Sequence, residues 1–302
     1  MQLLVSEIEN GIFLGAFFVL IALGYSMVYG ILRLINFAHG DFYMMAAYVS
    51  FTIFGAVGIS HLHSKWPIVL AVGLITMVAT GALAVLAERL IYRPMRRAAL
   101  LSLMIAALGL SQVLENGVLN IPAWGSQYRT YPVTSSAAGT SIFGTQFTYA
   151  QIVMVIISGL LAVGVYYLVG RTLIGKAMRA VAEDRVAASL MGVNVDFVIS
   201  LVFFVGGALA GAAAVMDSLY YGQINYLMGF TVGLQAFTAA VLGGIGNIGG
   251  AVVGGLLLGI VESIGTGVFG AEWSVVVAFG VLVVMLWVRP NGLLGERVAR
   301  RM

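Results

Sequence analysis

The sequence predicts an all-α polytopic membrane protein with about eight transmembrane helices. Of its 302 residues, 61% are hydrophobic and only 9% are charged, whereas a soluble domain carries about 25% charged residues. Apolar stretches long enough to cross the hydrocarbon core as helices, which takes about 20 residues, recur along the chain. The basic residues gather in a few short loops. A soluble fold could not hide this much apolar surface, so lipid must solvate part of it.

Eight segments meet the length and composition expected of a membrane-spanning helix. They are Gly11–Leu32, Phe42–Ile59, Pro67–Ala87, Ala98–Leu119, Tyr149–Val169, Phe197–Met216, Gly249–Ile264 and Trp273–Val288. A further stretch, Gly229–Gly244, is apolar but short and rich in glycine, so it either crosses the membrane or re-enters it. We expect one transmembrane domain over residues 1–302 and no cleavable signal peptide, because the first ten residues contain two glutamates and no basic residue.

The basic loops predict the orientation of the chain. Three regions are rich in Lys and Arg and are therefore predicted to be cytoplasmic: Arg89, Arg93, Arg96 and Arg97; Arg171, Lys176, Arg179 and Arg185; and Arg289, Arg297, Arg300 and Arg301. Residues 120–148 hold a single basic residue, Arg129, and are predicted to be extracytoplasmic. An even number of crossings must separate the second basic region from the third, so Gly229–Gly244 is counted as a crossing. This gives nine passes with the N-terminus outside; a re-entrant Gly229–Gly244 would instead expose the arginine-rich tail externally.

Several features exclude particular sites. Gly170–Ala177 matches the phosphate-binding pattern GxxxxGK[ST] except at its last position, where an alanine replaces the hydroxyl that would hold Mg²⁺, and a membrane helix precedes it instead of a strand. We therefore predict no ATPase site and no enzymatic activity in this chain. The absence of cysteine excludes disulfides and thiolate metal sites. His61 and His63 alone are weak evidence for a metal, and a net charge of +3 does not indicate nucleic-acid binding.

A cytoplasmic helix is predicted over Gly175–Asp196, within the loop 171–196. Its apolar residues recur near helical spacing opposite Arg179, Glu183, Asp184 and Arg185, and Gly192 offers a helix end. The helix could lie on the inner leaflet. Its mixed charge suits a groove on a protein partner better, because an anionic membrane surface favours Lys and Arg alone.

Two constellations could line a translocation pathway. The first is Asn36, His39, Gly40 and Asp41, where Asp41 or Asn36 is expected to cap the second membrane helix, with Gly40 permitting the turn. The same break could present polar groups to a solute at membrane depth. The second is Gly243, Gly244, Gly246 and Asn247, a glycine density that good helix does not tolerate. Such backbone persists at membrane depth only when it is buried in protein or lines a wet cavity.

Small-residue stripes at Gly207/Gly211, Gly250/Gly254 and Gly255/Gly259 predict close helix packing. Few carboxylates fall within spans. Glu262 lies deepest and is a candidate pathway residue, since membrane carboxylates are functional by default. Glu115 and Asp217 lie near helix ends and are expected at the membrane interface. No ladder of buried Lys, His and acidic residues crosses the membrane, which disfavours a proton relay.

Three stretches together resemble the permease subunit of bacterial branched-chain amino acid ABC transporters, the LivH type. They are Gly30–Tyr48, Arg179–Val193 and Gln235–Glu262, and the ending Val288–Gly295 is also similar. The resemblance implies a multi-pass importer subunit of the bacterial inner membrane. It also implies that Arg179, Glu183, Asp184, Arg185 and Gly192 belong to a coupling helix that docks into an ATPase.

The implied partners are a homologous second permease, two cytoplasmic ATPases that bind the ATP, and a periplasmic substrate-binding protein. Besides membrane lipid, no cofactor or nucleic acid is expected on this chain. Leucine, isoleucine or valine would be the substrate. Two alternatives remain open: a permease for urea or short-chain amides, whose sequences are closely similar, and an ion-coupled secondary amino acid carrier. A structural subunit of a respiratory complex is disfavoured by the missing relay.

Overall fold

A computed structural model describes residues 2–58, 66–133, 139–142 and 145–295. Within this part of the chain, eight helices are long and apolar enough to cross a membrane, as predicted. The long helices are α1 (Gln2–Leu32), α2 (His39–Val57), α3 (Trp66–Ala87), α5 (Leu100–Asn120), α6 (Tyr149–Arg171), α9 (Val195–Tyr221), α11 (Ile248–Phe269) and α12 (Ser274–Val288). The π-helical turn η1 (Glu88–Tyr92) and α4 (Arg93–Met95) extend α3, and the 3-10 turn η2 (Ala271–Trp273) precedes α12.

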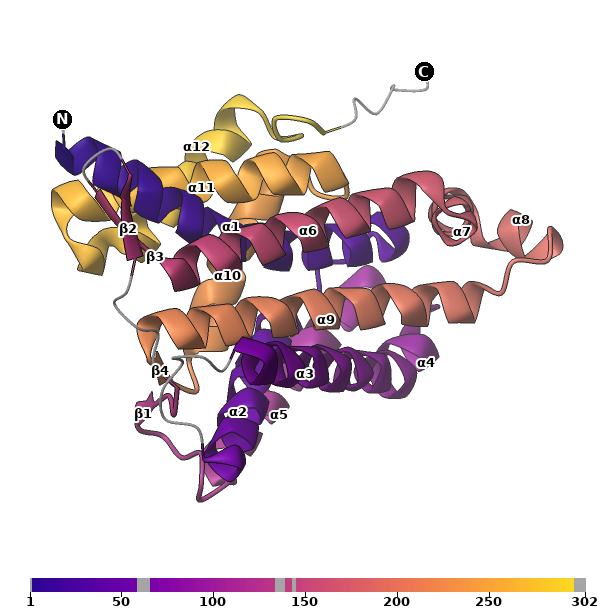
Figure 1. The fold of residues 1–302 in the computed structure, drawn as a ribbon. Helices are drawn as coiled ribbons and strands as arrows, with labels where there is room; N and C mark the ends of the chain where they lie inside the picture. The colour runs from indigo at the N-terminus through magenta and orange to yellow at the C-terminus, as the bar shows by residue number, and fades with distance from the viewer. Residues whose placement is uncertain (1, 59–65, 134–138, 143–144, 296–302) are drawn as a thin grey trace.

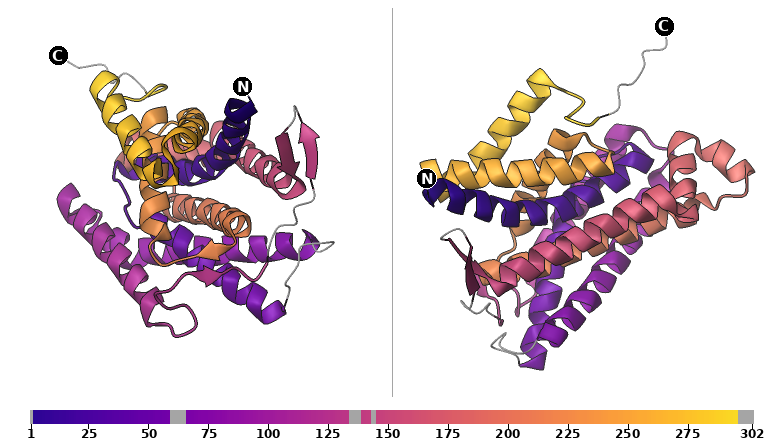
Figure 2. Two further views of the ribbon diagram at one scale, coloured as in Figure 1. Left: turned by 90° about the vertical axis from the view of Figure 1, so that its left-hand side faces the viewer. Right: turned by 45° about the horizontal axis from the view of Figure 1, so that its top comes forward.

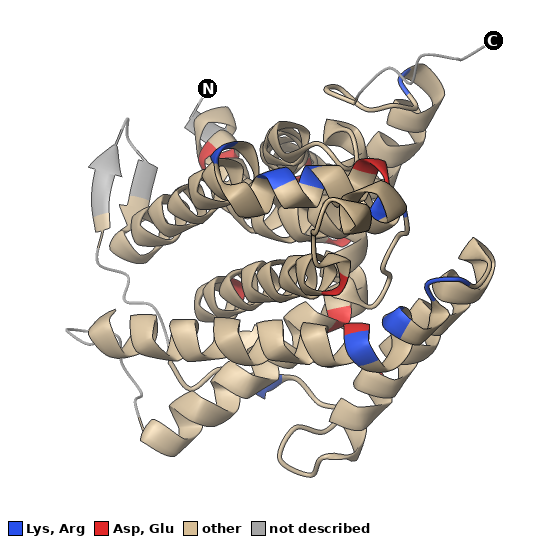
Figure 3. Cartoon of the chain, turned by 90° about the vertical axis from the view of Figure 1, so that its right-hand side faces the viewer, with Lys and Arg blue, Asp and Glu red and all other residues tan. Residues whose placement is uncertain are grey.

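Most of the long helices run side by side between two ends (Figure 1). The inner end carries α7 (Leu173–Glu183) and α8 (Arg185–Leu190), and the outer end carries the N-terminus and the strands. Strands β1 (Arg129–Thr130) and β4 (Gln223–Ile224) pair with each other, as do β2 (Gly139–Ile142) and β3 (Thr145–Thr148). The sequence analysis predicted none of these strands, three of which (β1, β2 and β3) lie within residues 120–148. Figure 3 looks onto the inner end, where Lys and Arg residues, in blue, lie on several helices; the positive-inside rule places such residues on the cytoplasmic side.

Helix α1 lies at the centre of the molecule and packs closely along α11 (Figure 2). A Cβ on Gly259 of α11 would lie only 2.2 Å from the Gly15 nitrogen and 2.5 Å from the Gly11 oxygen of α1. Likewise, Gly211 faces the backbone of α3 and Gly254 faces that of α10 (Met228–Gly243). The glycine stripes therefore bring backbones together, which is the packing role predicted for them.

Helix α10 carries the chain across the bundle. Helix α9 ends at the outer end, beside β4, whereas α11 begins at the inner end next to Asn247. The chain must therefore pass from one end to the other through α10, which is tilted relative to its neighbours in Figure 1. With only 16 residues, α10 is shorter than the roughly 20 residues that usually cross the hydrocarbon core as a helix. The structure thus supports the crossing that charge parity predicts for Gly229–Gly244.

The expected single helix over Gly175–Asp196 is wrong in one respect, because the chain breaks at Asp184 into α7 and α8. Asp184 has an extended backbone, and its Oδ1 accepts hydrogen bonds from the N–H groups of Val186 at 2.7 Å and Ala187 at 3.0 Å. It therefore caps a new helix. His61, His63 and the last three arginines of the tail lie outside the described residues.

Candidate translocation pathway and coupling surface

The outer half of the bundle contains an open cavity of about 300 Å³ that residues of α1, α9, α10 and α11 line. Glu262 of α11 lines it and is buried, with 3% of its surface exposed. Its Oε1 accepts hydrogen bonds from Gln235 Nε2 at 2.8 Å and from Ser274 Oγ at 2.5 Å. Its Oε2 is buried without a hydrogen-bond partner. We call this space, with Glu262 at its wall, the outer cavity.

Asp217 of α9 also lines the outer cavity, and its Oδ2 accepts a hydrogen bond from the Tyr43 hydroxyl at 2.5 Å. Asp217 is 8% exposed, so protein rather than solvent surrounds its side chain. The sequence does not show that α2 packs against α9 and brings the Tyr43 hydroxyl to Asp217. Glu115, by contrast, lies partly exposed on α5 and accepts a hydrogen bond from Gln112.

Asn36 is buried in the segment between α1 and α2. Its Oδ1 accepts hydrogen bonds from the Ala38 N–H at 3.2 Å and from the Tyr92 hydroxyl at 2.6 Å. Asn36 therefore fixes the turn just ahead of α2, but it does not cap α2 as predicted, because Ala38 is the capping residue. The other expected cap, Asp41, is wrong: it lies in the first turn of α2, and Ala38 occupies the capping position without a side-chain hydrogen bond.

His39 and Gly40 begin α2 deep among the neighbouring helices. The His39 ring is buried beside Gly24 of α1, and its Nε2 has no hydrogen-bond partner. A Cβ on Gly40 would come within 2.2 Å of the Gly229 carbonyl oxygen of α10. Gly40 is not among the residues with positive φ. It therefore permits a close helix contact rather than the turn predicted for it.

The glycines Gly243, Gly244 and Gly246 form a tight turn between α10 and α11. A Cβ on Gly243 would lie 1.9 Å from the Gly250 carbonyl oxygen, so the two helices meet backbone to backbone. Gly244 and Gly246 have φ values of 108° and 93°, which L side chains rarely adopt. Asn247 then caps α11, because its Oδ1 accepts a hydrogen bond from the Gly250 N–H at 2.9 Å. The glycine density thus forms a turn at the inner end.

Residues 289–295 of the tail clasp this turn. The Leu293 N–H donates to the Leu242 carbonyl and the Leu294 N–H donates to the Gly243 carbonyl, both at 2.9 Å. Asn247 Nδ2 returns a hydrogen bond to the Leu294 carbonyl at 2.8 Å. Gly292 has a φ of 81° and lies against Gly244, where a Cβ would approach to 2.4 Å. The ending Val288–Gly295 therefore has a structural role that the sequence alone did not reveal.

The coupling surface, residues 171–196, divides its apolar residues between two environments. Met178 and Val181 of α7 are buried against the bundle. On and after α8, Val186, Leu190 and Met191 are 69%, 82% and 84% exposed at the inner end. Gly192 then turns the chain with a φ of 84°. Thus α7 anchors the loop to the bundle, and α8 presents exposed apolar side chains.

The charged residues of this surface mostly hold the loop in place. Arg179 donates to the Val169 carbonyl of α6, and Arg185 Nη2 donates to the Ile31 carbonyl of α1 at 3.1 Å. Partial burial, and secondarily the Arg96 guanidinium, lower the pKa of Arg185 from its ordinary value, yet it stays charged at neutral pH. Glu183 ends α7 with no resolved ion pair to a described residue. The loop is therefore attached to α1 and α6.

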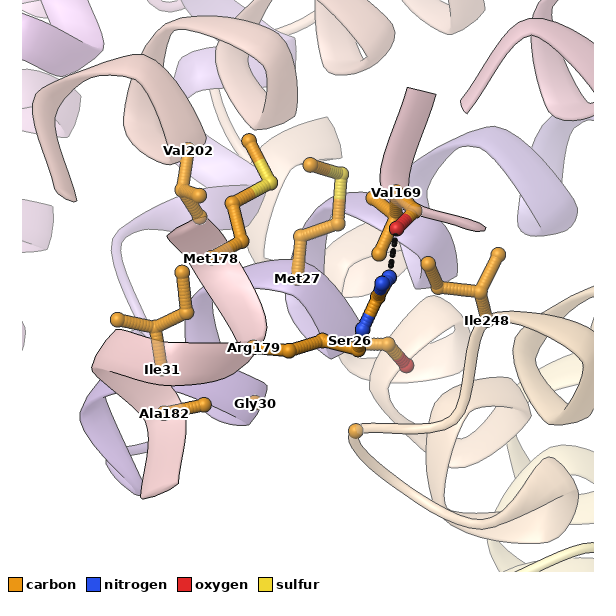
Figure 4. A pocket seen from close by; sticks show the side chains of 11 residues that line it. Ser26, Met27, Gly30, Ile31, Val169, Met178, Arg179, Ala182, Val202 and Ile248 are labelled. Atoms are coloured by element: carbon orange, nitrogen blue, oxygen red, sulfur yellow. Dashed lines mark hydrogen bonds between the residues drawn. The ribbon is translucent and has the colours of Figure 1, made fainter. Parts of the chain in front are cut away.

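An inner cavity of about 110 Å³ lies where α7 meets the inner end of α1 (Figure 4). Arg179 and Met178 of α7 line one side, Ser26 and Gly30 of α1 line another, and Gly246 of the α10–α11 turn completes the wall. The coupling surface and the glycine turn therefore adjoin one space, which the sequence did not predict. A displacement of α7 would change the shape of this cavity directly.

An ion-pair cluster joins α3 to α9 at the inner end. Glu88 is fully buried in η1, and its carboxylate accepts hydrogen bonds from Arg96 and from Ser200 Oγ. Arg96 and Arg93 also pair with Asp196 at the start of α9. Sequence reasoning assigned the arginines only to orientation, because their partners lie about one hundred residues away along the chain.

Comparison with known proteins shows which family has this sequence and architecture. The family described as "Branched-chain amino acid transport system / permease component" matches residues 7–286. The chain belongs to this family. It is 39% identical over 296 residues to the high-affinity branched-chain amino acid transport system permease protein BraD of Pseudomonas aeruginosa, covering 96% of this chain and 95% of that protein. It is 40% identical over 294 residues to LivH of Escherichia coli and 39% identical to LivH of Salmonella typhimurium, at the same coverage.

No solved structure matches the chain. Family membership and the eight apolar helices make this permease a multi-pass protein of the bacterial inner membrane. It is a transport subunit rather than a catalytic enzyme.

Proposed function

We propose that this chain is a membrane subunit of an ATP-driven, binding-protein-dependent importer for leucine, isoleucine and valine. The observation that carries the proposal is identity of 39% and 40% over nearly the whole chain to permeases named for high-affinity branched-chain amino acid transport. Residues 1–302 would form one permease domain. The partners would be a second, homologous permease, two cytoplasmic ATPases and a periplasmic substrate-binding protein, so that the membrane channel is a heterodimer.

ATP would bind to the partner subunits and not to this chain. In support, the residues that nearly match the phosphate-binding pattern belong to a helix and its cap. Thr172 caps α7 by accepting a hydrogen bond from the Gly175 N–H, and Lys176 lies in that helix. A phosphate-binding loop instead follows a strand and leaves its backbone N–H groups free for the ligand.

Docking of the ATPase would occur at α8. Exposed Val186, Leu190 and Met191 give this short helix an apolar surface at the inner end, of the kind that fits a groove on a protein partner. When ATP draws the two ATPases together, α8 would pull on α7. Arg179 and Arg185 would transmit the movement to α6 and α1 through their carbonyl contacts. Helices held by such contacts rearrange as rigid bodies, which alternates access to the pathway.

The pathway would run past the outer cavity with Glu262 toward the inner cavity beside Gly246. His39, Asn36, Gly40 and Asp41 would support the pathway as packing elements of α2, since none of them lines either cavity. Gly243, Gly244 and Asn247 would form the hinge of the α10–α11 turn.

Two other substrates or mechanisms compete with this proposal. A urea or short-chain amide permease would share the architecture but would have no need of a carboxylate-lined cavity. An ion-coupled carrier would use Glu262 to hold an ion. The tight α10–α11 turn and the exposed α8 favour the ATP-driven machine, because a secondary carrier needs no cytoplasmic docking helix.

The test is substrate uptake in proteoliposomes that contain this chain, with and without the homologous permease and the two ATPases. We expect leucine import only when these partners, the binding protein and ATP are all present, and competition by isoleucine and valine but not by urea. Leucine uptake by this chain alone under an ion gradient would contradict the importer mechanism. ATP-dependent import of urea would contradict the substrate.

A further inference from the structure

The outer cavity has an unusual charge pattern. Two carboxylates, Glu262 and Asp217, line it, and no Lys or Arg is among its lining residues in the described chain. Glu262 is almost completely buried, yet one of its two oxygens has no hydrogen-bond partner. A buried acceptor left without a donor is costly. The Glu262 carboxylate at the cavity wall therefore has hydrogen-bonding capacity that the described residues do not fill.

The remaining polar groups are placed unevenly in the cavity. Gln235 and Ser274 already donate to the bonded oxygen of Glu262, which fixes the carboxylate in place. Nearer the outer end, Gln223 of β4 and Asn225 add amide groups that can donate to an anion. The cavity is thus acidic at Glu262 and amide-lined toward its outer end.

An apolar wall completes the cavity. Phe17 and Phe18 of α1 and Val232 of α10 line it, and aliphatic and aromatic side chains of this kind hold a hydrocarbon group by excluding water. A volume of about 300 Å³ is at the lower end of the range for small-ligand sites. The space suits one small molecule that carries a cation, an anion and an aliphatic group.

We propose that the outer cavity binds the transported amino acid directly, with its α-ammonium group donating to the Glu262 carboxylate. Its carboxylate points outward to the amides of Gln223 and Asn225, and its side chain contacts Phe17, Phe18 and Val232. Asp217 supplies the second negative charge near the ammonium group and is held by the Tyr43 hydroxyl. This inference deepens the proposed function and rests on it, because it assigns the substrate groups to named residues of the permease.

The chain lacks cysteine, so a single reporter thiol can be introduced without other changes. Thr231 lines the outer cavity and is partly exposed. In the assembled complex in lipid nanodiscs without the binding protein, Thr231→Cys is labelled with a charged methanethiosulfonate. We expect millimolar leucine to slow labelling. We expect 3-methylbutan-1-amine, which retains the ammonium group, to slow it as well, and 4-methylpentanoate, which lacks that group, to leave it unchanged.

The decisive variant is Glu262→Gln in the same reporter background. Its amide keeps the size of the side chain and an acceptor for Gln235 but removes the charge, so the leucine concentration for half-protection should rise about tenfold or more. Glu272→Gln is the matched control, because Glu272 is exposed at the same end and does not line the cavity. It should behave like the unmodified reporter. Assembly of Glu262→Gln with the ATPases, and its ATP hydrolysis, report whether the variant folds.

Three results would overturn the assignment: no protection by leucine, equal protection by 4-methylpentanoate, or unchanged protection in folded Glu262→Gln. Leucine import by the unmodified complex is measured in parallel. If import persists while protection fails, the inference about the outer cavity is wrong and the proposed function stands. If import itself fails, the proposed function is wrong.

Discussion

The break at Asp184 gives a prediction about coupling that can be worked through in numbers. Helix α8 has six residues, far fewer than the roughly 12 to 15 that an isolated helix needs in water. Its order therefore depends on the Asp184 cap and on the burial of Ala188. Replacing a capping Asp by Ala costs about 1 kcal/mol, which lowers the ordered fraction of a marginal helix by roughly fivefold. Asp184→Ala should therefore weaken ATPase binding by up to about fivefold.

The assay is the affinity of the ATPase subunit for the permease in nanodiscs, measured by biolayer interferometry. Asp184→Asn is the control, since asparagine caps as well as aspartate but carries no charge. We expect Asp184→Asn to bind like the unmodified chain, and amide exchange over 185–190 to accelerate only in Asp184→Ala. Equal loss of binding in both variants would show that the charge, not the cap, is what the ATPase needs. Unchanged binding in Asp184→Ala despite faster exchange would refute the docking role of α8.

Three further predictions concern stability and assembly. Gly259→Ala should lower the free energy of unfolding by about 1–3 kcal/mol, because its methyl group would overlap the backbone of α1. Thermal unfolding in detergent measures this change. Gly164→Ala is the control that should not be destabilised, because a Cβ at Gly164 has no neighbour within 4 Å. Asn247→Ala should lower the free energy of unfolding by about 1 kcal/mol, because it removes the α11 cap, and should make the tail more sensitive to protease. Asn247→Asp should keep the cap and lose only the hydrogen bond to the tail. Equal protease sensitivity in the two variants and the unmodified chain would contradict the role of Asn247 in holding the tail. Glu88→Ala should lower the free energy of unfolding by roughly 1.5–3 kcal/mol, because it removes the acceptor of Arg96 and Ser200 while Arg96 keeps its pair with Asp196. A melting temperature equal to that of the unmodified chain would contradict this.

Hydrophobic length was sufficient to predict eight spans and their order along the chain. The Gly229–Gly244 crossing is an instructive case, because its residues alone left crossing and re-entry open. The arginines on either side decided the matter through parity. The stripes Gly207/Gly211 and Gly255/Gly259 also predicted close packing, since small residues at helical spacing have few other uses in a membrane helix.

What the sequence could not show was which residues meet across the fold. Gly40 looks like a turn residue until α10 is seen lying against it. Nothing in the sequence indicates that the Tyr43 hydroxyl donates a hydrogen bond to Asp217. The break at Asp184 was accessible in principle, because an aspartate that follows one helical stretch and precedes another is a favoured cap, but the apolar spacing continued smoothly through it.

The partnership of α1 with α11 has a consequence for how the protein is made. Helix α1 is the first to enter the membrane, yet its glycine-lined face packs against a helix that begins more than 200 residues later. At the usual pace of synthesis, about 5–20 residues per second, α1 must wait in the bilayer for tens of seconds before its neighbour arrives. During that interval lipid or an insertion factor must cover the face that Gly259 will later fill. Nascent chains stalled before α11 should therefore expose α1 to crosslinking and degradation.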